Sequence, residues 1–302
     1  MSNMYSNDVY NNERKRPVST SAVVRIVIWS VVFFLLAGVF TVAMIGHGVG
    51  GGFGSINIGG YWYDEDDYSV GNGSTRATVN EISIDWVAGS VTVIEGEGEE
   101  ILISETYDGA DDDQKLRWKV EDGELDIQYS KPVLFGSVQS LHKDLTVTIP
   151  SSMMNGLEEL HISAVSATQT VAVAVRELEI DSVSGTVEVK GSFHSVSLDT
   201  VSGNLNFEGS VRDLDLDSVS ARATVRLTEQ ADSLEVDTVS GNVTLILPES
   251  TTGFRVDTDA LSNRVDIRDF DVGSDKKWGD GRMRIQVDAV SAKLIVEKET
   301  KD

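Results

Sequence analysis

The residues best placed to do chemistry recur in a short repeated turn, where an Asp is followed three positions later by a Ser. The carboxylates are Asp181, Asp199, Asp217, Asp237 and Asp288, the hydroxyls are Ser184, Ser202, Ser220, Ser240 and Ser291, and glycine follows at Gly185, Gly203 and Gly241. Such a row would suit calcium, which takes oxygen ligands. Asp and Ser also commonly bond turn amides, and the repeated turn D-[ST]-V-S-G does not itself have the D-x-D spacing of calcium loops. We therefore interpret these residues as structural and expect no bound metal.

Other candidate groups are isolated from any partner that would activate them. The chain has four histidines, namely His47, His142, His161 and His194. No two of them have the i, i+4 spacing of metal ligands. Ser140 and Lys143 match S-x-x-K, but no S-D-N or K-T-G motif accompanies them. The acidic loop from Asp269 to Asp280 has Ser274 where a calcium loop needs glycine. The sequence thus predicts no catalytic, cofactor-binding or metal-binding residue. It contains many Asp and Glu residues that could form a catalytic pair, but no feature of the sequence favours one pair over another.

The charge is strongly acidic and unevenly distributed. The chain of 302 residues has a formal net charge of -24, with 25 basic and 49 acidic residues. Residues 1–45 hold four of the basic and two of the acidic residues. The excess of carboxylates elsewhere excludes nucleic acid as a partner, because binding a polyanion needs Lys or Arg. Its plainest role is solubility, and the alternative is a cationic partner or divalent ions. Since there is no cysteine, no disulfide or thiol chemistry is possible.

One apolar segment predicts a membrane anchor. Residues 26–45 (IVIWSVVFFLLAGVFTVAMI) are twenty uncharged residues, long enough to cross a hydrocarbon core. Basic residues precede the segment and acidic residues follow it, so we expect the tail 1–25 in the cytoplasm and the rest of the chain outside. A cleaved signal peptide is the alternative, but the segment is long and no A-x-A-like cleavage site follows it. Residues 46–75 are predicted to be a Gly-rich, acidic linker.

The rest of the chain is a repeat with a period near 18 residues. Val-Ser-Gly or Val-Ser-Ala begins at 165, 183, 201, 219, 239 and 290, with a degenerate copy at 261. Apolar residues alternate on both sides of each turn, and the parity changes across it, which indicates strands joined by a corner. Stacking each coil on the last would bury the apolar ladders. We therefore predict an all-β fold, a β-solenoid over 76–302, with an irregular lead-in at 76–150 and regular repeats at 151–297.

These motifs carry a resemblance. The order LTVTIP (145–150), repeated D-[ST]-V-S-G turns, VTLILP (243–248) and WGDGRMRIQVDAVSAKLIV (278–296) resembles the bacterial β-strand-repeat family labelled "putative adhesin", a domain of unknown function. The resemblance covers residues 76–297 and implies a cell-envelope protein with an N-terminal span and no catalytic site. Some members are associated with envelope-stress systems. The chain departs from the pattern where glycine is expected, at Ala167, Ala221, Asn263 and Ala292.

Three functions follow as hypotheses. The first is a non-enzymatic cell-surface binding or scaffold protein, a single-pass membrane protein whose partners would be cell-wall polymer, an envelope protein or divalent cations. The second is an envelope-stress regulatory subunit that contacts a membrane partner through its span, with Ser30, Gly38 and Thr41 as contact residues. The third, a wall-polysaccharide enzyme, is the least favoured because no carboxylate pair stands out.

Overall fold

The computed structural model describes residues 59–61, 63, 64, 66–109, 111–137 and 141–300. Apart from two short 3-10 turns, η1 (Asp112–Gln114) and η2 (Met154–Gly156), every regular element in these ranges is a strand. No helix in this part of the chain is long and apolar enough to cross a membrane. The predicted span at 26–45 and the tail 1–25 lie outside the described residues, as do His47, Ser140 and residues 46–58, 62 and 65 of the linker.

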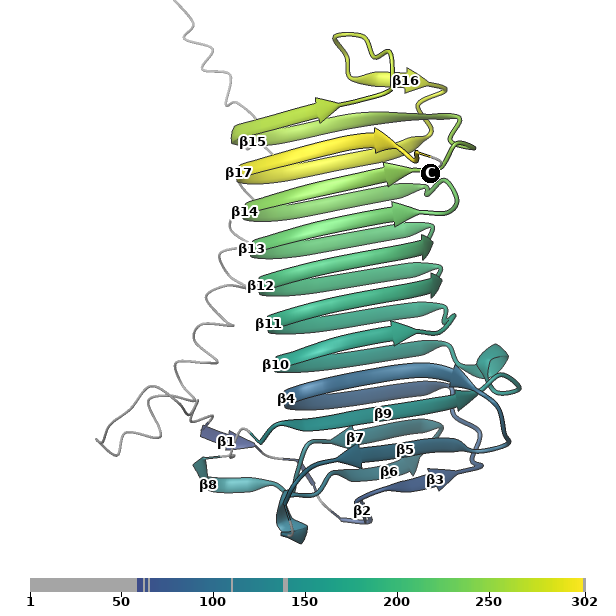
Figure 1. Ribbon diagram of the computed structural model, residues 1–302, viewed down its shortest axis with the longest axis vertical. Coiled ribbons are helices and arrows are strands. Elements are labelled where there is room, and N and C mark those ends of the chain that lie inside the picture. Colours follow the sequence, from purple (N-terminus) through teal and green to yellow (C-terminus); the bar gives the residue numbers. More distant parts are fainter. Residues whose placement is uncertain (1–58, 62, 65, 110, 138–140, 301–302) are drawn as a thin grey trace, which may run out of the picture.

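Eight long parallel strands form a stack, and this arrangement confirms the predicted all-β, solenoid-like fold (Figure 1). In spatial order they are β4 (Glu81–Gly96), β10 (Glu159–Ala172), β11 (Glu177–Ser192), β12 (Ser195–Ser210), β13 (Asp213–Leu227), β14 (Ser233–Leu247), β17 (Met283–Lys298) and β15 (Gly253–Ile267). Each strand is one rung that folds back at its repeated turn, so the stack has two layers. We call the part of a rung before the turn the first arm and the part after it the second arm.

The core lies between the two layers of arms. In β11 the first arm buries Leu178 and Ile180, and the second arm buries Val187 and Val189. The inward positions are even-numbered before the turn and odd-numbered after it, which is the predicted change of parity. In-register pairing repeats these positions from rung to rung and builds apolar ladders. Burial of each Val, Leu or Ile contributes roughly 1.5–3 kcal/mol relative to exposure.

The turns have two geometries, and these explain the missing glycines. Gly185 and Gly203 have φ of +141° and +148°, and a Cβ on Gly203 would lie 2.2 Å from the carbonyl oxygen of Gly185. Ala221 stands in register with Gly203 but lies outside the positive-φ region. Ala167 and Ala292 also lie outside that region. Alanine is therefore compatible with a turn whose φ is not positive, whereas Gly203 needs the conformational freedom of glycine.

The C-terminal end departs from simple sequential stacking. Adding each coil to the last would place β15 next to β14, but β17 pairs with both and β15 is the terminal rung. The short β16 (Lys277–Gly279) pairs antiparallel with the start of β15. Phe254, Phe270 and Trp278 contact one another at ring-centroid distances of 4.8–5.9 Å. The prediction of sequential order was therefore wrong. The strand β17 has the regular repeat and pairs with a rung on each side, whereas β15 is the last rung and contacts the aromatic cluster.

The lead-in strands close the other end of the stack. β7 (Glu124–Gln128) pairs with the first arm of β4, and β9 (Lys143–Pro150) pairs with its second arm. Four more strands extend the sheet from these two, and they are β2 (Ser69–Val70), β3 (Gly73–Thr75), β5 (Ile101–Thr106) and β6 (Arg117–Glu121). The last two, β1 (Gly59–Tyr61) and β8 (Val133–Ser137), form a separate two-stranded sheet. This smaller set of strands covers the rung of β4 that would otherwise be an open edge.

Lys143 lies inside this closed end. Its side chain is fully buried, and its ammonium lies 2.5 Å from a carboxylate oxygen of Glu105. It also donates to the carbonyl oxygens of Gln114 and Tyr129, and it sits 5.2 Å from the Trp86 ring centroid. Burial lowers the pKa of Lys143, and the neighbouring Glu105 carboxylate opposes that effect. Lys143 is therefore a satisfied internal cation with no surface access, unlike the lysine of an acyl-transfer site.

Candidate binding surface

The two outer faces of the stack differ in charge. On β10 to β15 the outward positions of the first arms alternate with buried ones and carry thirteen acidic and two basic residues. The acidic residues are Glu159, Glu177, Glu179, Asp181, Asp199, Asp213, Asp215, Asp217, Glu235, Asp237, Asp257, Asp259 and Asp288, and the basic ones are Arg255 and Arg284. The second arms carry five basic and four acidic residues at their outward positions. The basic ones are Lys190, Arg222, Arg226, Arg264 and Lys293, and the acidic ones are Glu188, Glu208, Asp266 and Glu297.

The repeated aspartates form a continuous column on the first-arm face, which we call the Asp ladder. It comprises Asp181, Asp199, Asp217, Asp237 and Asp288, each in register with the next. Neighbouring strands lie about 4.8 Å apart, so like charges are stacked closely. Burial, followed by the charge of neighbouring carboxylates, raises the pKa of Asp199, Asp217 and Asp237 to about 7. The ladder is therefore partly protonated near neutral pH.

Two carboxylate oxygens of the ladder stand out for their surroundings. Asp217 Oδ1 and Asp237 Oδ1 are buried with no hydrogen-bond partner among the described residues. These aspartates occupy the outward face ahead of the corner, and each stacks on the aspartates of the adjacent rungs. The part of the chain that the structure describes contains no group of three or more His, Asp or Glu residues able to hold a metal ion.

The repeated serines divide into two groups. The Ser184 hydroxyl donates to the Val165 carbonyl at 3.3 Å, and Ser202 donates to the Val183 carbonyl at 3.5 Å, so both tie one rung to the previous one. The hydroxyls of three later serines have no hydrogen-bond partner within the described ranges and are exposed, namely Ser220, Ser240 and Ser291. The structural role predicted for the turn serines thus holds for Ser184 and Ser202, through carbonyls rather than amides.

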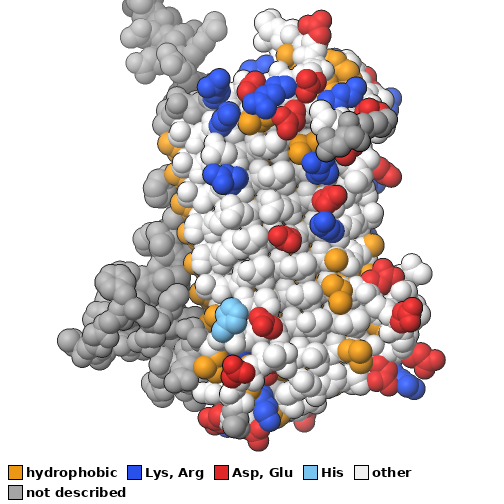
Figure 2. Space-filling view, viewed as in Figure 1, with side chains coloured by type: hydrophobic (Ala, Val, Ile, Leu, Met, Phe, Trp, Pro, Cys, Tyr) orange, Lys and Arg blue, Asp and Glu red, His pale blue; other side chains and the backbone are white. Residues whose placement is uncertain are grey.

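The free serines border an open hollow on the second-arm face. The hollow has a volume of about 550 Å³ and crosses the rungs from β12 to β15. Its lining combines small turn residues with polar and basic side chains, namely Gly203, Asn204, Ser220, Ala221, Arg222, Ser240, Gly241, Asn242, Arg264, Ser291, Ala292 and Lys293. Figure 2 shows this face, where Lys and Arg side chains gather toward the C-terminal end of the stack.

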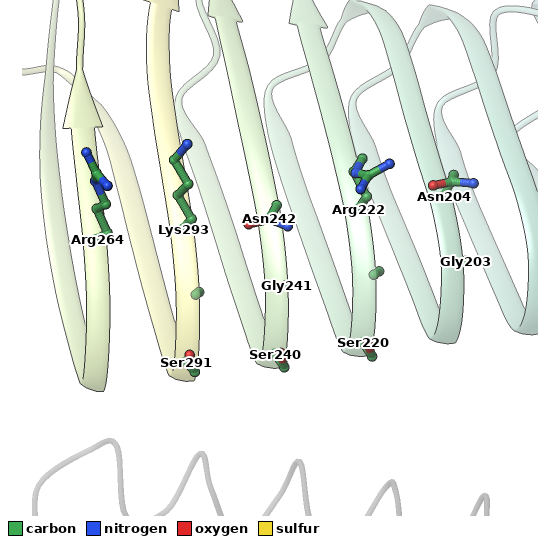
Figure 3. Close-up of a pocket in the computed structure, with 12 residues that line it drawn as sticks. Gly203, Asn204, Ser220, Arg222, Ser240, Gly241, Asn242, Arg264, Ser291 and Lys293 are labelled. Atoms are coloured by element: carbon green, nitrogen blue, oxygen red, sulfur yellow. The ribbon is translucent and has the colours of Figure 1, made fainter.

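Three cations of the hollow form a row across the strands, which we call the cation row. Arg222 is in register with Asn242, Asn242 with Lys293, and Lys293 with Arg264. Figure 3 shows these side chains on successive rungs, with the serines nearer the corner. Arg222 and Arg264 are exposed and Lys293 is half-buried. None of the three has an ion-pair partner among the described residues.

Sequence reasoning missed the cation row for a specific reason. The repeat is recognised by its identical residues, whereas the residue just after the turn differs from unit to unit. The residues at this position are Asn204, Arg222, Asn242, Lys293 and Arg264. Aligning the units on their Val-Ser-Gly or Val-Ser-Ala turns and comparing charge at this variable position would have found it for the first four. Arg264 follows the degenerate turn at 261–263, so its place became clear only from the pairing of β15 with β17.

Comparison with known proteins found a matching family model and similar solved structures. The family model described as Toastrack DUF4097 matches residues 79–211 and again 159–277. A "putative cell adhesion protein" from Clostridium sporogenes is 11% identical, with 76% of this chain and 100% of that chain covered and a TM-score of 0.29. A "putative adhesin" from Bacteroides fragilis is 10% identical, with coverage of 75% and 97% and a TM-score of 0.37. A "putative lipid binding protein" from Parabacteroides distasonis is 16% identical, with coverage of 76% and 97% and a TM-score of 0.27. No curated protein matches the chain significantly.

Proposed function

The chain belongs to the Toastrack DUF4097 family, and we propose that it is a non-enzymatic binding or scaffold protein that displays its acidic β-stack outside the cytoplasmic membrane. The second-arm face is its binding surface, and a component of the cell envelope is its partner. The names of the structural neighbours, which refer to adhesion and lipid binding, are compatible with a binding role.

The hollow on the second-arm face carries this proposal. Its cations and three of its serine hydroxyls are unpartnered within the described residues, although the chain contains 49 acidic residues that could have paired with them. Polar groups that have no partner within the protein can bind a ligand without first breaking an internal contact. The groups that could suggest catalysis are placed differently, since Lys143 is enclosed and the Asp ladder stacks on itself. The proposed protein therefore binds its partner without catalysing a reaction.

Binding to envelope material tests this function. The full-length chain in detergent is expected to co-sediment with purified envelope fragments. A triple variant that removes the cation row, Arg222→Ser, Lys293→Ser and Arg264→Ser, is expected to stay in the supernatant. The matched control replaces three cations that have ion-pair partners and lie off the second-arm face, Arg176→Ser, Arg212→Ser and Arg255→Ser, with the same change of net charge. Equal sedimentation of both triple variants would contradict a role for the second-arm face.

The proposed topology has a separate test that uses the absence of cysteine. A cysteine introduced at Thr228, which is exposed in a loop between rungs, is expected to react with a membrane-impermeant maleimide on intact cells. A cysteine at Asn7, in the predicted cytoplasmic tail, is expected to react only after lysis. Protection of position 228 on intact cells would place the β-stack inside and reject the topology.

A further inference from the structure

We propose that the cation row binds an extended, hydroxyl-bearing polymer that carries phosphate or carboxylate groups along its length. This inference rests on the proposed function and names the class of ligand for the same surface. Four features carry it: the missing ion-pair partners of the row, the repulsion within the row, the length of the row, and the free hydroxyls beside it.

The row stands out because the neighbouring cations of the same face are paired. Lys190 lies 3.0 Å from Glu208, and Arg226 lies 3.3 Å from Glu299. Arg268, just after β15, lies 3.0 Å from both Asp266 and Glu297. Arg222, Lys293 and Arg264 have no such neighbour among the described residues. Their charge is therefore available to an external anion.

The row is also repulsive in the unbound protein. Lys293 and Arg264 are directly opposed on adjacent strands, and like charges in this arrangement cost about 0.2–1 kcal/mol. An anion bound between them would relieve that cost. The acidic residues of the first arms lie on the opposite side of the stack, at the roughly 10 Å spacing of packed sheets, and salt weakens their repulsion in the surrounding solvent, where the screening length is about 8 Å. A ligand on the second-arm face is therefore nearer to the cations of the hollow than to these carboxylates.

The length of the row favours a polymer over a small anion. Arg222 and Arg264 are three rungs apart, which is roughly 14 Å at the usual strand spacing. A single phosphate or carboxylate reaches only one or two of the cations, whereas a linear polymer lying along the stack meets all three. Arginine can bind either kind of oxyanion with two parallel hydrogen bonds.

The remaining lining indicates what else the polymer carries. Ser220, Ser240 and Ser291 present free hydroxyls one rung apart, and Asn242 places an amide between Arg222 and Lys293. These groups both donate and accept hydrogen bonds, as recognition of hydroxyls requires. The small residues Ala221 and Gly241 leave room for the polymer backbone over the strands. The surface fits a polyol phosphate or a uronic acid polysaccharide better than a polymer without hydroxyls.

Titration calorimetry with the full-length chain in detergent tests the inference with four probes. They are a glycerol phosphate polymer, polygalacturonate, neutral dextran, and glycerol phosphate monomer. Binding to at least one charged polymer is expected, weakening as salt rises, with dextran inactive and the monomer at least about tenfold weaker than the polymer. Which charged polymer binds then identifies phosphate or carboxylate as the recognised group.

The cation-row variants give the second comparison. The triple variant Arg222→Ser, Lys293→Ser and Arg264→Ser is expected to lose at least about tenfold in affinity, since each exposed ion pair is worth up to about 1 kcal/mol. The control triple at Arg176, Arg212 and Arg255 is expected to stay within about twofold of the original protein. Asn242→Asp, which inserts a carboxylate into the row without deleting a cation, is expected to weaken binding as well.

Several outcomes would overturn the inference. They are equal binding of dextran, equal binding of the monomer, or full affinity in both the triple variant and Asn242→Asp. If the protein sediments with envelope fragments but binds none of the four probes, the ligand class is wrong and the proposed function stands. If it does not sediment with them either, both fail.

Discussion

At the scale of single residues, Gln169 is a polar side chain in a position built for an apolar one. It is fully buried, and neither its amide nitrogen nor its amide oxygen has a hydrogen-bond partner among the described residues. Its register neighbours on either side are Val91 and Val187. An unsatisfied buried amide costs roughly 1–3 kcal/mol. This rung therefore keeps a destabilising group inside an otherwise continuous apolar ladder.

Gln169→Val is expected to stabilise the protein by about 1–3 kcal/mol, because valine continues the ladder and removes the unpaired amide. Chemical denaturation followed by fluorescence measures the free energy of unfolding. Thr168→Val, at an exposed position of the same arm, is the control and should change it by less than about 0.5 kcal/mol. A loss of stability in Gln169→Val would mean that the amide has a partner.

The Asp ladder gives a second prediction at this scale. Asp217 is flanked by Asp199 and Asp237, so Asp217→Asn removes two like-charge contacts. Each such contact costs about 0.2–1 kcal/mol when both groups are ionised, which gives an expected gain of about 0.5–2 kcal/mol at pH 8. The gain should shrink at pH 5, where these three aspartates are largely protonated. Asp271→Asn, in an exposed loop, is the control of equal charge. Equal gains at both pH values would contradict the ladder.

At the scale of elements, the repeated turn was the feature that the sequence predicted best. Its period near 18 residues and the change of parity after Asp181 required strands that bend and stack, and the register of β11 with β12 follows that repeat. The ends could not be predicted in the same way. The cap formed by Phe254, Phe270 and Trp278 comes from segments that do not repeat, and periodicity gives no information about which rung it covers.

The two turn geometries lead to a paired prediction. Gly203→Ala is expected to destabilise the protein by at least about 1–3 kcal/mol, since the new methyl group meets the Gly185 carbonyl and φ is positive. Ala221→Gly, at the same register position in the next rung, should cost only about 0.5–1 kcal/mol through added chain entropy. Thermal unfolding of both variants measures the difference. Similar losses in the two variants would show that the turns share one geometry.

At the scale of the whole molecule, the charged residues of the rungs are sorted between the two faces of the stack. The outward positions of the first arms carry thirteen acidic and two basic residues, whereas those of the second arms carry four acidic and five basic ones. The alternation of inward and outward residues was predictable from sequence. The distribution of charged residues between the two faces could not be predicted in this way. It depends on which arm of a rung each residue belongs to, and therefore on where the turn lies in three dimensions. The hollow and its cation row result from the same distribution, because basic residues lie on the second arms.

The acidic face predicts how stability depends on pH. The folded-state pKa of Asp199, Asp217 and Asp237 is about 7, above the usual value of 3.8. The folded protein therefore binds more protons than the unfolded chain between about pH 4 and 7, and the free energy of unfolding falls as pH rises through that window. Thermal melts should give a higher midpoint at pH 5 than at pH 8. The opposite order would show that these carboxylates are ionised without penalty.

The claim that the second-arm face is the binding surface can be tested most directly by protection of single cysteines. Asn242→Cys lies in the hollow and Ser197→Cys lies on the acidic first-arm face, and the chain has no other cysteine. Maleimide labelling of the full-length protein is measured with and without envelope fragments. We expect the fragments to slow labelling at 242 at least about fivefold and to leave 197 unchanged, as burial of one face by a ligand requires. Protection at 197 alone, or equal protection at both positions, would contradict the account.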